Sequence, residues 1–250
     1  MKKKRLDVLL VERGLAESRT RAEALVLAGR VAVVGKERVK PGTPVDDAAE
    51  VTVGAPEHPW VSRAGVKLDF GLTHFGIDPA RRVCLDLGAS TGGFTDVLLA
   101  RGAAKVYAVD VGWGQLHAKL RRDPRVVLRE KVNARLLSRA EVPEEPSLLV
   151  GDVSFISLGL VLPAAVPLLA PLADVLVLVK PQFEAERGEV GRGGIVRDEA
   201  VRARAVARVS RAAEALGLES RGTVPSPITG ADGNVEYLAA FRRNPATLSG

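Results

Sequence analysis

The chain has 250 residues, 46% hydrophobic and 26% charged, a globular ratio that excludes disorder as its overall state. Its single cysteine, Cys84, excludes an internal disulfide, and its three histidines are too scattered to favour a metal site. We therefore expect a cytoplasmic protein that needs no metal.

The net charge of +6 lies entirely in the first forty residues. Positions 1–40 hold eleven Lys and Arg against five Asp and Glu, whereas the remaining 210 residues hold 25 of each sign. A basic segment with apolar periodicity is typical of phosphate binding, and a basic, solvated tail on an enzyme is the simpler alternative.

The N-terminal part predicts a small α+β domain. Helices are expected at residues 6–12 and 18–28, with Ser18 as the cap of the second, and strands at 31–34 and 50–53. Residues 40–44 read as a loop. Residues 54–59 contain two prolines and a glycine and form the best linker, so we expect domains at 1–59 and 60–250.

Beyond residue 60 the pattern alternates between strands and helices. Apolar runs predict buried strands at residues 83–87, 106–109, 126–128, 148–150 and 175–179. Helices are predicted at residues 94–101, 115–122, 136–141, 160–169 and 198–216. This alternation favours an α/β fold with a mostly parallel sheet covered by helices on both faces. Two last strands, at 223–228 and 235–241, predict an antiparallel hairpin at the sheet edge.

One uncharged run, residues 153–173, is long enough to span a membrane. Pro163, Pro167 and Pro171 recur within it at every fourth position, and Asp174 follows directly. A buried helix followed by a buried strand explains the run better, so we expect no stable membrane association.

A glycine loop follows the first predicted strand, in the sequence DLGASTGGF. Glycines at this place let a ligand approach the backbone at the carboxyl edge of a sheet. The spacing is neither that of a dinucleotide-binding loop nor that of a P-loop, and an acid before the glycines suits a ligand with an ammonium group, such as S-adenosylmethionine. A bare strand–helix turn is the alternative. The candidate cofactor residues of this loop are Asp86, Gly88, Ser90, Gly92, Gly93 and Phe94.

Asp110 ends the second strand of this part, where a carboxylate can accept hydrogen bonds from both ribose hydroxyls of a nucleoside. Asn133, after the third strand, is a candidate for the edge of an adenine, although a surface asparagine explains it almost as well. Asp110 therefore indicates a nucleoside ligand but does not identify the nucleoside.

The motif GDVSF after the fourth strand restricts the acceptor of a methyl group. Methylation of an exocyclic base amine usually relies on an Asn/Asp-Pro-Pro-aromatic turn, which is absent. Methylation at a pyrimidine carbon needs a cysteine, and Cys84 lies inside a strand as a small hydrophobe. An oxygen acceptor remains, and a ribose hydroxyl needs a base poised near it.

Lys180 is the candidate for that base, because a lysine that closes a fully apolar strand is costly unless it is paired. Lys67 and Glu236 are further ionisable residues in apolar surroundings. For each residue alone, a salt bridge at the rim of the sheet is an equal alternative.

Together these residues resemble a known family. Lys67, Asp152, Lys180 and Glu236 stand in the order of the K-D-K-E set of FtsJ-type RNA 2′-O-ribose methyltransferases, and residues 5–35 look like an S-four-type RNA-binding domain. That domain joined to an FtsJ-like domain is the layout of the TlyA (haemolysin A) family. VSRAGVKL, DLGASTGGF, GDVSFISL, LVKPQFE and GNVEYL all look like its signatures.

The resemblance implies a Rossmann-like, S-adenosylmethionine-dependent methyltransferase that modifies ribose 2′-hydroxyls of ribosomal RNA. Lys180 would accept or steer the hydroxyl proton, Lys67 would act on Lys180 by like-charge proximity, and Asp152 and Glu236 would orient the lysines and the ribose. Asp152 would also contact the cofactor. Residues 1–59 would bind ribosomal RNA or ribosomal subunits, with the candidate contacts Arg5, Arg13, Ser18, Arg19, Arg21 and Arg30.

Two readings from other classes stay open. A membrane-active haemolysin would account for the older family name and for the uncharged run. A non-catalytic RNA-binding or ribosome-assembly protein would keep the basic module without the chemistry.

Overall fold

The computed structural model of the chain describes residues 3–27, 30–36, 39–54, 58–230 and 233–244. The chain divides into two units, Met1–Pro59 and Trp60–Gly250, each with its own hydrophobic core. The larger unit carries two separate apolar clusters, one on each face of its sheet.

The N-terminal unit contains two helices, α1 (Leu6–Glu12) and α2 (Arg19–Leu27), and two antiparallel pairs of strands. One pair joins β2 (Val31–Val33) to β4 (Val51–Val53), and the other joins β1 (Lys3–Arg5) to β3 (Pro44–Asp46). Leucines of α1 pack against the apolar face of α2 and the valines of the strands.

Most predictions for this unit are confirmed. Both helices form, and the Ser18 hydroxyl accepts a hydrogen bond from the backbone N–H of Arg21 at 3.2 Å, as an N-cap does. The β1–β3 pair was not predicted, because each strand has three residues and β3 begins within the predicted loop at 40–44. The expected helix end at residue 28 and linker residues 55–57 lie outside the described part of the chain.

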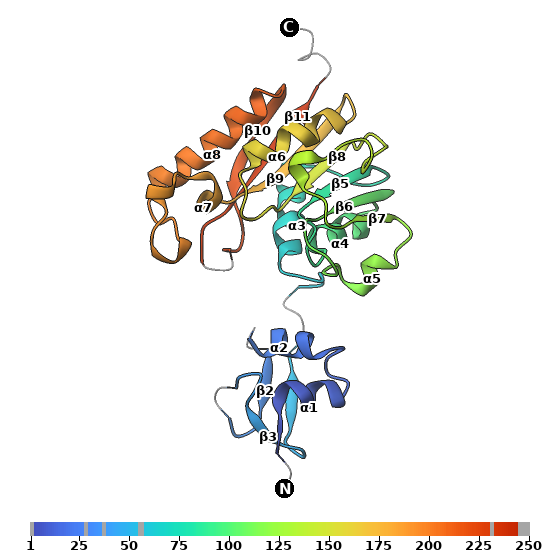
Figure 1. The fold of residues 1–250 in the computed structure, drawn as a ribbon, viewed down its shortest axis with the longest axis vertical. Coiled ribbons are helices and arrows are strands. Elements are labelled where there is room, and N and C mark those ends of the chain that lie inside the picture. The colour runs from blue at the N-terminus through green and yellow to red at the C-terminus, as the bar shows by residue number, and fades with distance from the viewer. Residues whose placement is uncertain (1–2, 28–29, 37–38, 55–57, 231–232, 245–250) are drawn as a thin grey trace. The chain divides into compact units, whose positions relative to one another are not determined.

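The larger unit is built on a seven-stranded sheet in the order β10-β11-β9-β8-β5-β6-β7 (Figure 1). Its strands are β5 (Val83–Leu87), β6 (Lys105–Val109), β7 (Val126–Arg129), β8 (Leu148–Gly151), β9 (Ala173–Val179), β10 (Leu218–Pro225) and β11 (Tyr237–Arg243). The five strands from β9 to β7 run parallel, and β10 and β11 form an antiparallel hairpin at the edge. The predicted fold class, with its edge hairpin, is confirmed.

Helices cover both faces of this sheet (Figure 1). The helices are α3 (Ala64–Phe75), α4 (Gly93–Ala100), α5 (Ala118–Arg121), α6 (Leu158–Ala165), α7 (Pro181–Glu184) and α8 (Glu199–Glu214), with short 3-10 helices η1 (Ala134–Leu136), η2 (Val166–Leu168), η3 (Arg187–Glu189) and η4 (Arg192–Gly194). Strand alternation sets the two faces: Cys84 of β5 points to the cluster of α3 and α4, whereas Leu85 points to that of α6 and α8.

Helix α3 was missed by the sequence analysis, because Gly65 and Gly71 lower the helix propensity of its segment. The structure explains Gly71. A Cβ there would lie 3.1 Å from side-chain atoms of Leu176 and of Leu238, so glycine lets α3 lie close to the sheet. The helix ends at Gly76 in a left-handed conformation, with φ of 61°.

Two other helix predictions are wrong. The predicted helix at 136–141 is replaced by η1 and turns, because the Glu141 carboxylate accepts hydrogen bonds from the backbone N–H and the hydroxyl of Ser138. The predicted helix at 115–122 shrinks to α5, a single turn. The uncharged run 153–173 forms α6, η2 and the first residue of β9, as predicted for a buried helix and strand.

Candidate active site

Five strands bring the candidate residues to one edge of the sheet. Because β5, β6, β8 and β9 are parallel, their carboxyl ends meet there, and each is followed at once by a candidate residue: Gly88, Asp110, Asp152 and Lys180. β11 runs the other way, and Tyr237 pairs with Val179, so Glu236 arrives at the same edge before its strand begins. The chain order reverses beside β5, where doubly wound sheets bind ligands.

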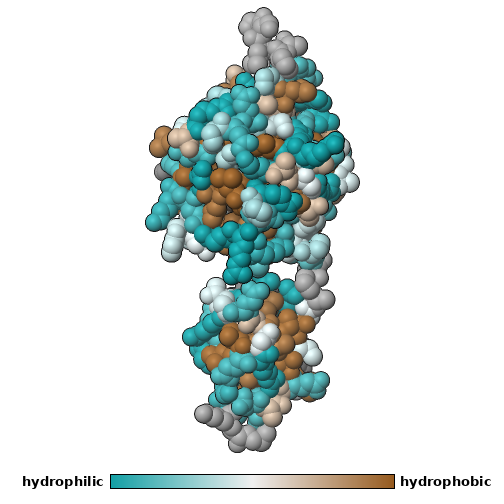
Figure 2. Space-filling view, turned by 90° about the vertical axis from the view of Figure 1, so that its right-hand side faces the viewer, coloured by the Kyte–Doolittle hydropathy of each residue, from teal (hydrophilic) through white to brown (hydrophobic). Residues whose placement is uncertain are grey.

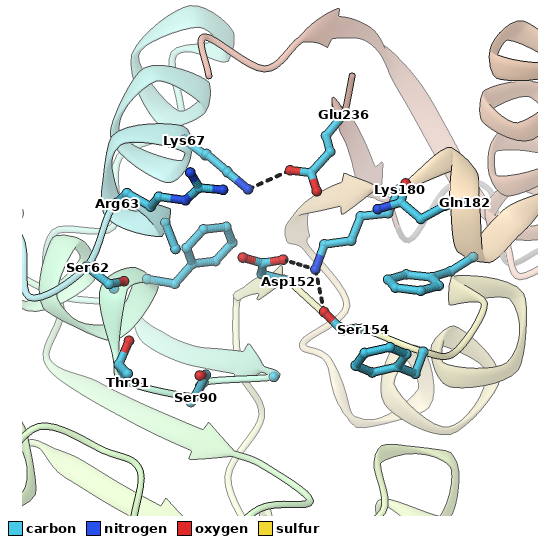
Figure 3. Close-up of a pocket in the computed structure, with 17 residues that line it drawn as sticks. Ser62, Arg63, Lys67, Ser90, Thr91, Asp152, Ser154, Lys180, Gln182 and Glu236 are labelled. Carbon is cyan, nitrogen blue, oxygen red and sulfur yellow. Dashed lines mark hydrogen bonds and ion pairs between the residues drawn. The ribbon is translucent and has the colours of Figure 1, made fainter. Parts of the chain in front are cut away.

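The first cavity at this edge, of about 410 Å³, is lined by all four residues of the K-D-K-E set (Figure 3). Lys67 enters from the first turn of α3 and Glu236 from the start of β11. Asp152 and Lys180 come from the ends of β8 and β9. Residues separated by up to 169 positions in sequence therefore share one small space.

The four residues form two separate ion pairs. Lys67 Nζ lies 2.5 Å from Glu236 Oε2, and Lys180 Nζ lies 2.6 Å from Asp152 Oδ1. The side chains of Lys67 and Glu236 are only 6% and 3% exposed, so this pair is the more deeply desolvated. Removing one partner of such a pair leaves an uncompensated buried charge, which costs about 3–5 kcal/mol.

Besides this ion pair, Lys180 has a hydrogen-bond partner that the sequence did not indicate. Its Nζ donates to the Ser154 hydroxyl at 2.7 Å and lies 5.9 Å from the centre of the Phe183 ring. Figure 3 shows the Lys180 ammonium between Asp152 and Ser154. The motif GDVSF pointed to the right segment, but nothing in the sequence indicated which side chain would contact the lysine.

Hydrogen bonds from the segment after β8 to Glu184, after β9, hold that segment in place. The carboxylate of Glu184 accepts hydrogen bonds from the Ser157 hydroxyl at 2.6 Å and from the Leu158 backbone N–H at 2.8 Å, at the start of α6. Burial raises the pKa of Glu184. Phe155, in between, is 90% exposed and has a φ of 62°, unusual for a bulky residue, and its ring contacts that of Phe183.

The glycine loop contacts this segment from the other side. Gly88 has a φ of 79°, and a Cβ there would lie 2.7 Å from the carbonyl oxygen of Asp152. A side chain is therefore excluded from Gly88, and the loop keeps its backbone open toward the cavities. Gly93 and Phe94, which begin α4, line the first cavity.

A second cavity, of about 580 Å³, adjoins the first and is lined by Asp110 and Asn133. Asp110 accepts hydrogen bonds from the backbone N–H groups of Ser90 at 2.7 Å and Gly112 at 2.6 Å. Each carboxylate oxygen keeps lone pairs for a further donor. Asn133 caps η1 through the N–H of Arg135, so it already has a structural role.

Both cavities share one wall, formed by Gly88, Ser90, Asp152, Ser154 and Phe155. A ligand in the second cavity and one in the first would therefore meet beside Asp152 and Ser154. This arrangement suits the transfer of a group between two bound molecules.

Two of the predicted cofactor residues line neither cavity. Asp86 is fully buried below the loop and accepts a hydrogen bond from the Thr95 hydroxyl at 2.6 Å. Burial raises the pKa of Asp86 to about 7; the Thr95 hydrogen bond opposes the rise and the charge of Asp152 adds to it. At Gly92 a Cβ would collide with side chains of Leu116 and Leu120, so this glycine serves packing.

The candidate RNA contacts of the N-terminal unit are largely engaged within the unit. Arg5 and Arg19 both donate to the buried carboxylate of Asp7, at 2.8 and 2.9 Å. The hydrogen bond from Arg5, supported by Arg19, holds the pKa of Asp7 well below its usual range. Arg13 and Arg30 instead donate to backbone carbonyl groups.

Arg21 differs from these arginines. Its side chain is exposed and has no partner among the residues that the structure describes. Arg5 and Arg19 are still 51% and 57% exposed, so their outer nitrogens can reach a phosphate while they hold Asp7.

The described residues contain no group of three or more His, Cys, Asp or Glu side chains that could hold a metal ion. In the same part of the chain, no helix combines the length and the apolar character needed to cross a membrane. On the face shown in Figure 2, hydrophobic residues occur in groups bordered by hydrophilic ones.

The fold and the site define the class of the protein. The larger unit shares its fold with the solved structure of N-methyltransferase NodS from Bradyrhizobium japonicum, which covers 76% of this chain and 99% of its own, with a TM-score of 0.52 at 17% identity. The chain belongs to the FtsJ-like methyltransferase family, which matches residues 60–243, and it carries an S4 domain at residues 4–51.

Similar proteins carry two kinds of name. The chain is 52% identical to the "16S/23S rRNA (cytidine-2′-O)-methyltransferase TlyA" of Mycobacterium tuberculosis, over 95% of this chain and 89% of that protein. It is 44% identical to "Hemolysin A" of Brachyspira hyodysenteriae, over 95% and 99%. A solved structure, "Putative hemolysin from Streptococcus thermophilus", has a TM-score of 0.77 at 42% identity and covers 98% of this chain and 90% of its own. The resemblance to the TlyA family is confirmed.

Proposed function

We propose that this protein transfers a methyl group from S-adenosylmethionine to a ribose 2′-hydroxyl of ribosomal RNA. The observation that carries the proposal is the position of Lys180, whose amino group is held by Asp152 at the wall that the two cavities share. The name of the mycobacterial relative, at 52% identity, supports a cytidine in ribosomal RNA as the acceptor.

The second cavity fits S-adenosylmethionine. Asp110 offers carboxylate oxygens for two ribose hydroxyls, and Asp152, at the shared wall, offers a negative charge for the ammonium or sulfonium end. Gly88 and Ser90 keep the backbone close to the ligand. The bound cofactor supplies an activated methyl group and leaves as S-adenosylhomocysteine.

The first cavity holds the acceptor ribose. Lys180 accepts the 2′-hydroxyl proton as the oxygen forms its bond to the methyl carbon, and Asp152, 2.6 Å away, stabilises the ammonium group that results. Lys67 supplies a positive field to the developing negative charge on the oxygen. Glu236 holds Lys67 in place and offsets its charge, so the expected like-charge effect of Lys67 on Lys180 is reduced.

The two units divide the work. Residues 60–250 bind the cofactor and the acceptor nucleotide, and residues 1–59 bind RNA through phosphates. Arg21, which has no side-chain partner among the described residues, is one cation available to them. A substrate in the ribosome also implies a cytoplasmic location.

The test is methylation of bacterial ribosomal subunits that lack the modification. Purified protein and S-adenosylmethionine labelled in the methyl group should yield labelled 2′-O-methylribose, mapped by nuclease digestion and mass spectrometry. Methylation on a base, or no transfer with intact cofactor binding, would contradict the proposal. Dye release from liposomes by the same preparation would support the haemolysin reading instead.

A further inference from the structure

Two residues of one segment hold the amino group of Lys180, Asp152 through an ion pair and Ser154 through a hydrogen bond. Asp152 Oδ1 lies 2.6 Å from Nζ, and Ser154 Oγ accepts a hydrogen bond from it at 2.7 Å. Among the residues that the structure describes, Ser154 is its only hydrogen-bonding partner, because the contact with Asp152 is an ion pair without hydrogen-bond geometry. The Phe183 ring lies 5.9 Å away and offers only its π face.

This pairing leaves one direction open. A lysine amino group has three positions besides its carbon, and all three are N–H donors when it is charged. When the group is neutral, two are N–H donors and the third is a lone pair. With the Ser154 hydroxyl accepting one N–H and the charge of Asp152 attracting the other, the lone pair takes the third position. Lys180 lines the first cavity, so this remaining position is the one that can serve the acceptor hydroxyl.

Ser154 is itself held in place. The Asp152 backbone N–H donates to the Leu87 carbonyl at 2.9 Å, which fixes the start of the segment. Glu184 fixes its end at the beginning of α6. Ser154 lies between these anchors and lines both cavities. Its hydroxyl is therefore a hydrogen-bond acceptor in a fixed position, which can orient the amino group of Lys180.

We propose that Ser154 is a positioning residue for methyl transfer, which sets the rotation of the Lys180 amino group together with Asp152. Without the hydroxyl, the amino group turns about its Cε–Nζ bond and its lone pair is aimed at the acceptor for only part of the time. The inference rests on the proposed function, since it assumes that Lys180 is the base.

The experiment compares Ser154→Thr with Ser154→Val, which have nearly the same shape and differ by one hydroxyl group. Residue 154 is exposed, so the additional methyl group has room. Single-turnover methyl transfer to ribosomal subunits is measured at saturating S-adenosylmethionine. We expect Ser154→Thr to stay within about threefold of the wild-type rate and Ser154→Val to fall about 10- to 100-fold, as for a misplaced reacting group. Affinities for S-adenosylhomocysteine and RNA should change less than about twofold. Equal rates for the two variants, whether high or low, would overturn the inference.

A second readout does not depend on turnover. Brief acetylation with acetic anhydride, followed by mass spectrometry of the peptide that contains Lys180, reports how firmly the amino group is held. Ser154→Val should raise the acetylation rate of Lys180 about threefold or more, and Ser154→Thr should leave it unchanged. If the wild-type protein transfers no methyl group, the proposed function is contradicted, but the acetylation of Lys180 still tests the role of Ser154. Equal acetylation of Lys180 in Ser154→Val and Ser154→Thr would overturn that role.

Discussion

Lys67 and Glu236 form a buried ion pair that joins the first turn of α3 to the start of β11, 169 positions later in the chain. Both residues line the first cavity, as do Asp152 and Lys180, and Asp152 alone of the four also lines the second cavity. Because both partners are almost fully buried, each depends on the other for its charge to be tolerated.

The first prediction follows from this dependence. Lys67→Met or Glu236→Gln alone should lower the free energy of unfolding by about 3–5 kcal/mol, because each leaves a buried charge without its partner. The double variant Lys67→Met/Glu236→Gln should recover most of that loss and still transfer no methyl group. Urea unfolding is followed by tryptophan fluorescence, since both tryptophans, Trp60 and Trp113, lie in the larger unit. Additive losses in the double variant would argue against a coupled pair.

The second prediction concerns the cofactor. Asp110→Asn should weaken the binding of S-adenosylhomocysteine about 10- to 100-fold, because a hydrogen bond to a charged acceptor contributes about 1.5–3 kcal/mol. Calorimetry gives the affinity, and the rise of the melting temperature with ligand gives an independent measure. Asp123→Asn is the matched control, since Asp123 is paired with Arg125 and lines neither cavity. An equal loss in both variants would remove Asp110 from the binding site.

The third prediction concerns Asp86 and pH. Its pKa is raised from 3.8 to about 7 in the folded protein, so the folded state binds this proton more tightly than the unfolded state does. The contribution of Asp86 to stability is therefore complete below about pH 4 and is lost as the pH rises to 7. Asp86→Asn should remove this loss and be more stable than wild type at pH 8.5, by up to about 4 kcal/mol.

Thermal unfolding at pH 5 and pH 8.5, followed by the same tryptophan fluorescence, measures the effect of Asp86→Asn. The difference between variant and wild type should grow with pH. A difference that is the same at both pH values would show that Asp86 is ionised at neither or at both, and would contradict the assignment.

The fourth prediction separates RNA binding from folding in the N-terminal unit. Arg21→Ala should weaken RNA binding and flatten its salt dependence by about one phosphate contact, without a loss of stability. Arg19→Ala, two positions earlier on α2, removes the same charge but also a partner of buried Asp7, so it should destabilise the unit. Filter binding at several salt concentrations and thermal unfolding check the two effects. Equal stability losses would show that Arg21 has a structural role too.

The sequence was sufficient to place the strands of the larger unit along the chain and to predict the edge of the sheet where the candidate site lies. Apolar runs marked the strands, and the residue after each run was the one that reached the site, as for Gly88, Asp110, Asp152 and Lys180. Helix α3 was not predictable from propensity, because its glycines serve close packing on the sheet.

Pairing was the other feature that sequence could not provide. Which carboxylate meets Lys67 depends on how α3 packs against β11, and which one meets Lys180 depends on the register of β8 with β9. The contacts of Arg5 and Arg19 with Asp7 depend on how α1 and α2 pack. The hydrogen bonds of Ser154 and Glu184 arise from two loops that are distant in the chain. Such contacts are set by the tertiary fold, and no local pattern marks them.

The role of Lys180 as the base is tested most directly by single-turnover methyl transfer to ribosomal subunits by Lys180→Ala and Lys180→Arg. A positioned base contributes about 10²- to 10⁴-fold, so Lys180→Ala should lower the rate by roughly that factor while cofactor affinity changes little. Lys180→Arg should be almost as slow, because a guanidinium keeps its proton and cannot act as a base, although it can still pair with Asp152. Rates near wild type in both variants would contradict a role of Lys180 in catalysis. A normal rate in Lys180→Arg alone would show that Lys180 acts only through its positive charge and not as a base.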